Sequence, residues 1–466
     1  MSSLVKSFSS LTLFTGLSQL LGMFATIRIA RLFAPDIYGQ YGVIIATVSI
    51  FQVIAALGLR QIVIRTIARD KSNSRVVYYS SLIGRLFGVI VSSIVLLIYQ
   101  FLHNRNISTI DLLMIASLFS LNFWESLENL AFGNQKMESS GYINFAFNII
   151  WVTCIYIFPR SYFTLELIFL TQIIFQFCKD IFYYAYSRRY NFLQGPLEKK
   201  DVMPELRVLI KDSSSYYLMY LLSLLTSQLP ILLLNANSSS TEVGFFNVSN
   251  KLLSPLSIVI STALVTLFPH FSKLYVSNKG GFYKQLKNAF ILFTIIGIFG
   301  AFTVTLFRGE VVNLLFGLAY AKSSMVMSYQ CWFLVINTGL LSLISNLLGA
   351  MDKQRTLSKI TIIGSLISVP ILWYGSRFGA ENLSLAYLIF SLLQFSYCWF
   401  FLVKFSDRRI HISFFVKILI ALLLFMVLAL LLPDSLSVII RLILFLVISG
   451  LLVVSIKKFQ VLSMFK

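Results

Sequence analysis

The sequence predicts an all-α, polytopic membrane protein with about fourteen transmembrane helices. Of its 466 residues, 58% are hydrophobic and only 12% are charged, about half the charged fraction of a typical soluble domain. A helix needs about 20 apolar residues to cross a bilayer. Stretches of suitable length lie near residues 11–32, 39–59, 78–101, 110–132, 141–158, 165–187, 213–235, 244–268, 288–307, 323–350, 357–376, 380–403, 413–432 and 436–456. Only Lys6 precedes the first stretch, which lacks a small-residue cleavage site, so we expect a retained helix and not a signal peptide.

The positive charge of the chain, formally +20, is unevenly distributed among the predicted loops. Basic residues gather in alternate loops, at 60–75, 136, 188–211, 273–287, 353–359, 404–409 and the tail 457–466. The intervening loops hold only Arg105, Arg160, Arg308, Lys322 and Arg377. This positive-inside pattern predicts that both termini are cytoplasmic. The positive charge of these loops then indicates how the chain is oriented in the membrane and that the loops contact anionic membrane lipid. It gives no reason to expect a nucleic-acid partner.

The cysteines give no sign of a metal site or a disulfide framework. Cys154, Cys178, Cys331 and Cys398 all fall inside predicted spans, with no CxxC motif and no histidine at ligand spacing. We therefore expect them to be packing residues and predict no metal.

A weak internal duplication divides the chain into two halves of six spans. The recurring motifs are YGQYGV (38–43) with VGFFNV (243–248), AFGNQKM (131–137) with AMDKQRT (350–356), and Gln176-Phe177 with Gln394-Phe395. Each pair joins one span to the sixth span after it, which predicts two parallel six-helix repeats with a binding cleft between them. The predicted parts are an N-terminal six-helix lobe at 1–187, a cytoplasmic connecting loop at 188–212, a C-terminal six-helix lobe at 213–403, and an additional two-helix hairpin and tail at 404–466.

Four stretches of the chain show the loose hydrophobic pattern with fixed glycines of a known transporter group. They are GLSQLLGMFATIRIARLFAPDIYGQYG, VGFFNVSNKLLSPLSIVISTALVTLFPHFSKL, VVNLLFGLAYAKS and the turn from Gly349 to Lys353. They resemble the polysaccharide transporter branch of the multidrug/oligosaccharidyl-lipid/polysaccharide (MOP) superfamily, most closely the Wzx type of O-antigen flippase. The resemblance implies a V-shaped, two-lobed helical bundle in the bacterial inner membrane. Such a protein moves an undecaprenyl-pyrophosphate-linked oligosaccharide from the cytoplasmic to the periplasmic leaflet, without a cofactor.

Cations inside the spans are the candidate ligands for an anionic substrate. A charged side chain at the bilayer centre costs roughly 2.5–3.5 kcal/mol on insertion scales, so each one needs a reason. Arg28 and Arg31 lie on the last turn of the first span, and Arg31 can also reach the headgroups as an ordinary anchor. Lys251 lies about two turns into its span with no acid at matching depth. We predict Arg28, Lys251, Arg85 and Arg31 as substrate-binding residues, because the substrate carries a pyrophosphate. Lys417 and Arg441 lie near the ends of the additional hairpin and are expected to face lipid.

A second group of charges falls in the inner half of the first lobe. Glu125 and Glu128 are three residues apart and share a helix face, and Arg85 and the pair Lys179-Asp180 lie at similar depth. One interpretation is a structural ion-pair network. The other is a proton or sodium coupling site formed by Glu125, Glu128, Lys179 and Asp180, since close carboxylates in a low dielectric raise each other's pKa.

Three other functions compete with this reading. An O-antigen polymerase or ligase needs a large outside loop for its active site, and no outside loop here exceeds roughly 15 residues. No nucleotide-binding fingerprint or catalytic triad pattern is present in the sequence, which also argues against an enzyme. A cation-coupled drug exporter of the same superfamily is expected to carry acidic cleft residues, for which Glu125 and Glu128 are candidates. A lipid II flippase is expected to carry arginines earlier in the first span, where this chain has Gln19 and Ala25.

Overall fold

The computed structural model describes residues 2–458 except 105–106, 161–162, 352, 406–411 and 434–436. Arg105, the basic residues within 406–411 and the tail from 459 onward therefore lie outside the described residues. Every regular element in the described part is a helix, as predicted, and no strand occurs there. The chain forms two compact units, Met1–Leu232 and Leu233–Lys466.

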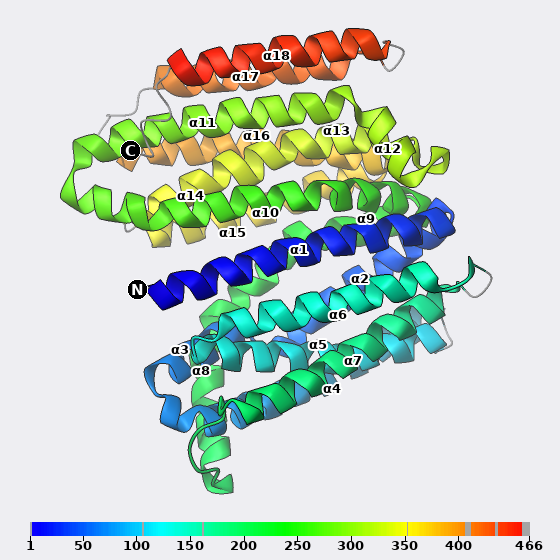
Figure 1. The fold of residues 1–466 in the computed structure, drawn as a ribbon, viewed down its shortest axis with the longest axis vertical. Coiled ribbons are helices and arrows are strands. Elements are labelled where there is room, and N and C mark those ends of the chain that lie inside the picture. Colours follow the sequence, from blue (N-terminus) through cyan, green and yellow to red (C-terminus); the bar gives the residue numbers. More distant parts are fainter. Residues whose placement is uncertain are drawn as a thin grey trace. The chain divides into compact units, whose positions relative to one another are not determined.

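The first unit contains eight long or medium helices and the start of a ninth (Figure 1). They are α1 (Ser2–Leu32), α2 (Pro35–Ala56), α3 (Leu59–Arg69), α4 (Ser74–Asn104), α5 (Thr109–Gly133), α6 (Met137–Ile157), α7 (Leu165–Arg189), α8 (Lys199–Ser227) and α9 (Leu229–Asn237). The N-terminus of α5 has a capping box, in which the side chains of Ser108 and Asp111 each accept a hydrogen bond from the other residue's backbone N–H. Helix α1 packs along α6, and α5 packs against α3, α4 and α7. Helix α8 packs on α3 and α4, so this unit extends beyond the predicted lobe at 1–187.

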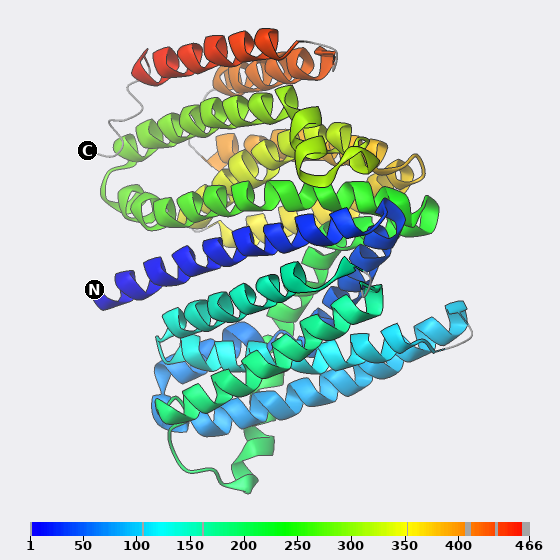
Figure 2. The same ribbon diagram turned by 45° about the vertical axis from the view of Figure 1, so that its right-hand side comes forward.

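The second unit contains the remaining helices (Figure 2). They are α10 (Ser240–Ser277), α11 (Lys279–Leu306), α12 (Arg308–Phe316), α13 (Ser323–Leu334), α14 (Ser342–Ala350), α15 (Gln354–Ser376), α16 (Ala380–Phe405), α17 (Ile412–Leu431) and α18 (Val438–Lys458). A π-helical turn at Val335–Leu341 joins α13 to α14. Helix α13 packs on α10 and α16, while the hairpin helices α17 and α18 both pack against α11. The additional hairpin predicted at 404–466 is thus a helical pair attached to the second unit.

Eleven segments of the described residues are long and apolar enough to cross a membrane. They are Ser10–Leu32, Pro35–Ala56, Lys71–Leu102, Thr109–Gly133, Met137–Ile157, Ser240–Leu264, Lys279–Leu306, Ser323–Ala350, Thr356–Ser376, Ala380–Phe405 and Ile412–Leu431. The predicted spans 165–187, 213–235 and 436–456 are also helical but are not among these segments. Charges interrupt the first of them, and a break at Gln228 divides the second between α8 and α9. The multi-pass fold is confirmed, whereas the count of fourteen spans is not.

Local structure departs from the sequence-based expectation at three places. Residues 59–69, expected as a loop, form α3, and Arg308–Phe316 forms α12. Arg441, expected to face lipid, is only 4% exposed and forms an ion pair with Glu310 of α12. The expectation for Arg441 was wrong because a partner from an unpredicted helix offsets the cost of burying its charge. The side chain of Lys417, in contrast, is exposed.

Two glycines one turn apart on α4 permit close helix packing. A Cβ at Gly88 would lie 2.3 Å from the carbonyl oxygen of Ala55 on α2, and one at Gly84 would lie 2.8 Å from a methyl group of Leu206 on α8. Small residues four positions apart let membrane helices approach closely in this way. The pair therefore fixes the distance of α4 from α2 and α8.

We expect Gly88→Ala to destabilise the first unit by about 1–3 kcal/mol, because the new methyl group must push α2 and α4 apart. The measurement is the melting temperature of the detergent-solubilised protein. Gly300→Ala on α11 is the matched control, since its Cβ would meet nothing within 4 Å. An unchanged melting temperature for Gly88→Ala, with the control also unchanged, would show that the contact is not constrained.

Candidate functional site

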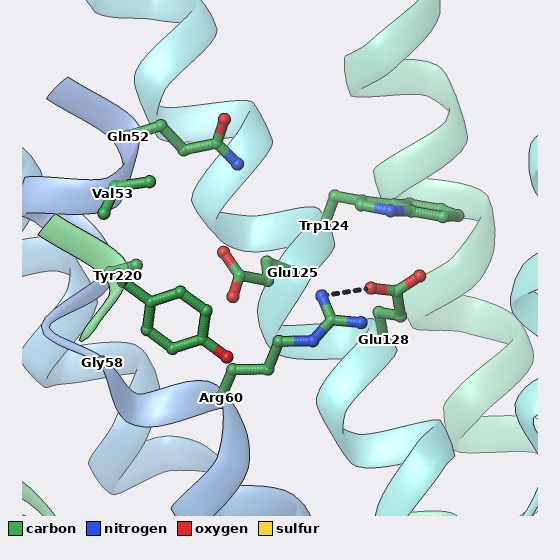
Figure 3. A pocket seen from close by; sticks show the side chains of 9 residues that line it. Gln52, Val53, Gly58, Arg60, Trp124, Glu125, Glu128 and Tyr220 are labelled. Atoms are coloured by element: carbon green, nitrogen blue, oxygen red, sulfur yellow. Dashed lines mark ion pairs between the residues drawn. The ribbon is translucent and has the colours of Figure 1, made fainter. Parts of the chain in front are cut away.

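A pocket with a volume of about 420 Å³ and three charged lining residues opens in the first unit beside the junction of α2 and α3. Its lining comes from α2, α3, α5 and α8 and from Gly58, one of the two residues between α2 and α3. The lining residues are Gln52, Val53, Ala56, Gly58, Arg60, Trp124, Glu125, Glu128 and Tyr220. Figure 3 shows Gln52, Glu125 and Tyr220 pointing toward one another from three different helices, with Arg60 beside them.

A backbone break between α2 and α3 positions Arg60. Leu57 and Gly58 both adopt left-handed conformations, with φ of 53° and 66°, which ends α2 and starts α3 in a new direction. A Cβ at Gly58 would lie 2.7 Å from the backbone nitrogen of Tyr217, so only glycine lets α8 approach this close. The break thus brings Arg60 and the tyrosine-bearing face of α8 to the same pocket.

Two ion pairs neutralise the charges of the pocket. Arg60 Nη1 lies 2.8 Å from Glu128 Oε2, and Arg85 Nη1 lies 3.1 Å from Glu125 Oε2. Arg85 is 1% exposed and also donates to Asn122 Oδ1 at 3.3 Å. Burial opposes the charge of Arg60, but Glu128 and Glu125 raise the pKa of its guanidinium above the usual value, so it is cationic. The glutamates are 15% and 20% exposed and remain accessible from the pocket.

Lys179 and Asp180 make separate contacts behind the pocket. Lys179 Nζ donates to Asn144 Oδ1 at 3.0 Å and lies 4.0 Å from the ring centroid of Trp124. The Asp180 carboxylate accepts hydrogen bonds from the Ser120 hydroxyl and from Gln176 Nε2. The charges predicted as one inner group therefore form three sets, built around Arg60–Glu128, Arg85–Glu125 and the adjacent pair on α7.

A second, smaller pocket of about 200 Å³ lies next to the first and shares Gln52 with it. Three further polar side chains from α2 and α7 line it, namely Ser49, Gln172 and Gln176. The Tyr41 hydroxyl donates to Gln172 Oε1 at 2.9 Å. Because Gln176 also donates to Asp180, polar groups extend from the first pocket to this buried carboxylate.

The four predicted substrate-binding cations occupy different surroundings. Arg28 is half-buried on α1, with its guanidinium 5.7 Å from the ring centroid of Tyr156, and no carboxylate among the described residues pairs with it. Arg31 is exposed at the end of α1. Lys251 is exposed on α10, eleven residues after Ser240, at the middle of the apolar segment Ser240–Leu264. The Arg85 side chain is buried and paired with Glu125, so in this conformation it cannot contact a substrate.

Sequence reasoning did not single out Arg60 or Gln52 as site residues. Arg60 was counted among the basic residues of an inside loop, because the apolar stretch ends at residue 59. The signal that could have found it is the Leu57-Gly58 step, where a glycine at the end of a span precedes a short amphipathic segment. The structure also places the side chain of Tyr220, on α8, in the pocket.

Solved structures of transporters share this fold. The lipid II flippase MurJ in its inward closed conformation matches with a TM-score of 0.72 over 95% of this chain and 97% of its own, at 14% identity. An inward-facing multidrug resistance MATE family transporter of the MOP superfamily matches with a TM-score of 0.60 over 84% of this chain and 96% of its own, also at 14% identity. The Vibrio cholerae MATE transporter VcmN in the bent form matches with a TM-score of 0.56 over 87% of this chain and 98% of its own, at 16% identity.

Sequence comparison identifies the family. Among curated proteins no sequence gives a significant match. A family model described as polysaccharide biosynthesis protein matches residues 4–275, more than half of the chain and including every residue of the pocket. The transporter fold agrees with the MOP superfamily resemblance of the sequence. The chain therefore belongs to the polysaccharide biosynthesis protein family.

Proposed function

We propose that this protein is a flippase for an undecaprenyl-pyrophosphate-linked oligosaccharide, such as an O-antigen repeat unit. It moves this lipid from the cytoplasmic to the periplasmic leaflet by alternating access along a cationic path. Three observations support the proposal: the family, the fold shared with a lipid II flippase and other MOP transporters, and the cations within the spans. The transport requires no covalent change in the substrate, so no enzymatic step is part of it.

The position and the exposure of Lys251 are the observation that best supports this proposal. Lys251 lies about 16 Å along the helix from Ser240, near the middle of the apolar segment Ser240–Leu264, so we expect its ammonium to lie deep in the hydrocarbon core. It is exposed, and no described carboxylate pairs with it. An ammonium facing lipid at this depth is costly, whereas one facing a water-filled path is solvated and can bind an anion. The pyrophosphate of the lipid carrier is such an anion.

Arg28 supports the same chemistry from the first unit. Among the described residues its Nε is buried without a hydrogen-bond partner, and its guanidinium contacts the face of the Tyr156 ring. A guanidinium in this state retains donors in a fixed planar fork, which suits bidentate binding of a phosphate group. We propose Arg28 and Lys251 as the main ligands of the pyrophosphate, with Arg31 as an outer cation.

The carboxylates of the first unit are the proposed site of ion coupling. Glu128 is paired with Arg60 and Glu125 with Arg85, and the Asp180 carboxylate accepts hydrogen bonds from neutral donors next to Lys179. A proton or sodium ion reaching a glutamate would compete with its arginine, and release of that arginine would bias the unit toward a second conformation. This gives Glu125, Glu128, Lys179 and Asp180 a proposed role in ion coupling.

We expect the protein in the bacterial inner membrane with both termini in the cytoplasm, because the basic loops demand this orientation. The measurement uses reporter fusions after Lys466 and within the loop 188–198, paired with a fusion in the segment 159–164. The first two should be active as cytoplasmic reporters and the third as a periplasmic reporter. The opposite pattern would refute the orientation.

Deletion of the gene in its native host tests the proposed function. We expect undecaprenyl-linked oligosaccharide to accumulate and surface polysaccharide to disappear, with both restored by the wild-type gene. Normal levels of both, together with increased sensitivity to cationic drugs, would instead identify a multidrug exporter. Accumulation of lipid II in place of the oligosaccharide would identify a lipid II flippase.

A further inference from the structure

Three charged side chains, Arg60, Glu125 and Glu128, line the pocket between α2, α3, α5 and α8, and with Arg85 buried against Glu125 the charges cancel. Arg60 and Arg85 balance Glu128 and Glu125, and each pair is in direct contact. A bound phosphate would face the carboxylates of Glu125 and Glu128, and a bound cation would face the guanidinium of Arg60, with that of Arg85 buried against Glu125. Neither ion could enter without breaking a pair or remaining close to a like charge, which is costly at this degree of burial. The lining thus favours an uncharged ligand.

The same lining offers hydrogen bonds of both kinds. The glutamates can accept hydrogen bonds from hydroxyl groups, the N–H groups of Arg60 can donate to hydroxyl oxygens, and the Gln52 amide can do both. Charge-assisted hydrogen bonds of this kind are stronger than those between neutral groups. A ligand that both donates and accepts through many hydroxyls meets this arrangement without disturbing the ion pairs.

Apolar surface completes the lining. Val53, Ala56 and the ring of Tyr220 contribute apolar surface to the lining. Figure 3 shows Trp124 on the other side of Glu125, next to Glu128. A sugar ring has hydroxyl edges and an apolar C–H face, so an aromatic ring beside hydrogen-bonding groups matches both parts. The volume of about 420 Å³ is within the usual range for small-molecule sites.

We propose that this pocket is a glycan subsite, which holds an uncharged sugar of the lipid-linked oligosaccharide while the pyrophosphate is bound elsewhere. The inference rests on the proposed function and adds the part of the substrate that this unit recognises. The positive-inside pattern places this end of α2 and α5 on the cytoplasmic side, where the substrate is first bound. The pocket then acts in selection of the sugar before transport.

The test measures binding of two probes to the purified full-length protein in detergent. One probe is undecaprenyl pyrophosphate that carries the repeat unit of the host's own surface polysaccharide, and the other is undecaprenyl pyrophosphate without sugar. The wild-type protein should bind the first probe more tightly. Gln52→Ala and Tyr220→Phe should each reduce affinity for the sugar-bearing probe about threefold to tenfold and leave affinity for the sugar-free probe unchanged.

Tyr79→Phe is the matched control. The Tyr79 hydroxyl forms a hydrogen bond with the Tyr184 hydroxyl at 3.1 Å, but Tyr79 does not line the pocket. It should bind both probes as the wild type does. The glycan subsite is refuted if the wild type binds both probes equally. It is also refuted if the pocket variants keep the full preference for sugar or lose affinity for both probes alike. Wild-type protein that binds neither probe would contradict the proposed flippase function itself.

Discussion

Lys251→Ala should abolish most transport at normal protein abundance, with at least a tenfold loss of rate. A charge-assisted hydrogen bond to a phosphate contributes a few kcal/mol, and roughly 1.4 kcal/mol corresponds to each factor of ten. Lys251→Gln should behave like the alanine variant, because it keeps a polar side chain but not the charge. Lys251→Arg should retain partial transport, because arginine keeps the positive charge but presents its N–H donors in a different geometry. The measurement is restoration of surface polysaccharide in a deletion strain, with membrane abundance checked by immunoblot.

Lys417→Ala is the matched control for this series. Lys417 is also an exposed lysine on an apolar helix, but it lies on α17 of the additional hairpin. We expect it to transport normally, and Arg28→Ala to resemble Lys251→Ala. Full complementation by the alanine variants of both Lys251 and Arg28 at wild-type abundance would show that these residues are ordinary anchors.

Glu125→Gln should reduce the stability of the first unit by about 3 kcal/mol, because it leaves the Arg85 guanidinium buried without its counter-charge. Arg85→Gln should cost a similar amount. The double variant should be less destabilised than the sum of the single ones, since neither charge is then left alone. The measurement is folded yield and melting temperature in detergent, followed by transport in cells.

An exposed ion pair in the same unit provides the control. Arg65 and Asp212 lie 3.0 Å apart with 42% and 45% of their side chains exposed. Neutralising either of them should change stability by less than about 1 kcal/mol. Additive effects of Glu125→Gln and Arg85→Gln on both expression and transport would mean that the two residues are not functional partners.

Helical spans were the most predictable feature of this protein. An apolar run must be helical in a bilayer because every backbone N–H and C=O needs an internal partner. The short helices α3 and α12 were missed because each contains charges and fewer than a membrane-spanning number of residues. The ion pairs between the charged residues were only partly predictable. The depth of Arg85 and Glu125 along their spans suggested their contact, whereas the pair Arg60–Glu128 depends on the direction that α3 takes after the left-handed step at Gly58.

The pocket could not be predicted because it combines side chains that are distant in sequence. Gln52 and Tyr220 are separated by 168 positions, and only packing of α8 against the α2–α3 junction brings them together. The corresponding signals in sequence, one glutamine and one of many tyrosines, do not differ from those of ordinary packing residues. The same limit applies to Arg441, whose partner Glu310 belongs to a helix that the hydropathy pattern does not reveal.

Flipping by the purified protein in proteoliposomes is the most direct test of the central claim. Undecaprenyl-pyrophosphate-linked oligosaccharide from the host is distributed in both leaflets, and a membrane-impermeant glycosidase is added outside. With wild-type protein, the enzyme should cleave nearly the whole pool, because inner-leaflet lipid is delivered to the outer leaflet. Vesicles with Lys251→Ala protein should resemble protein-free vesicles, in which only the outer-leaflet pool is cleaved. Cleavage limited to the outer-leaflet pool in wild-type vesicles, with the protein shown to be folded and inserted, would contradict the assignment as a flippase.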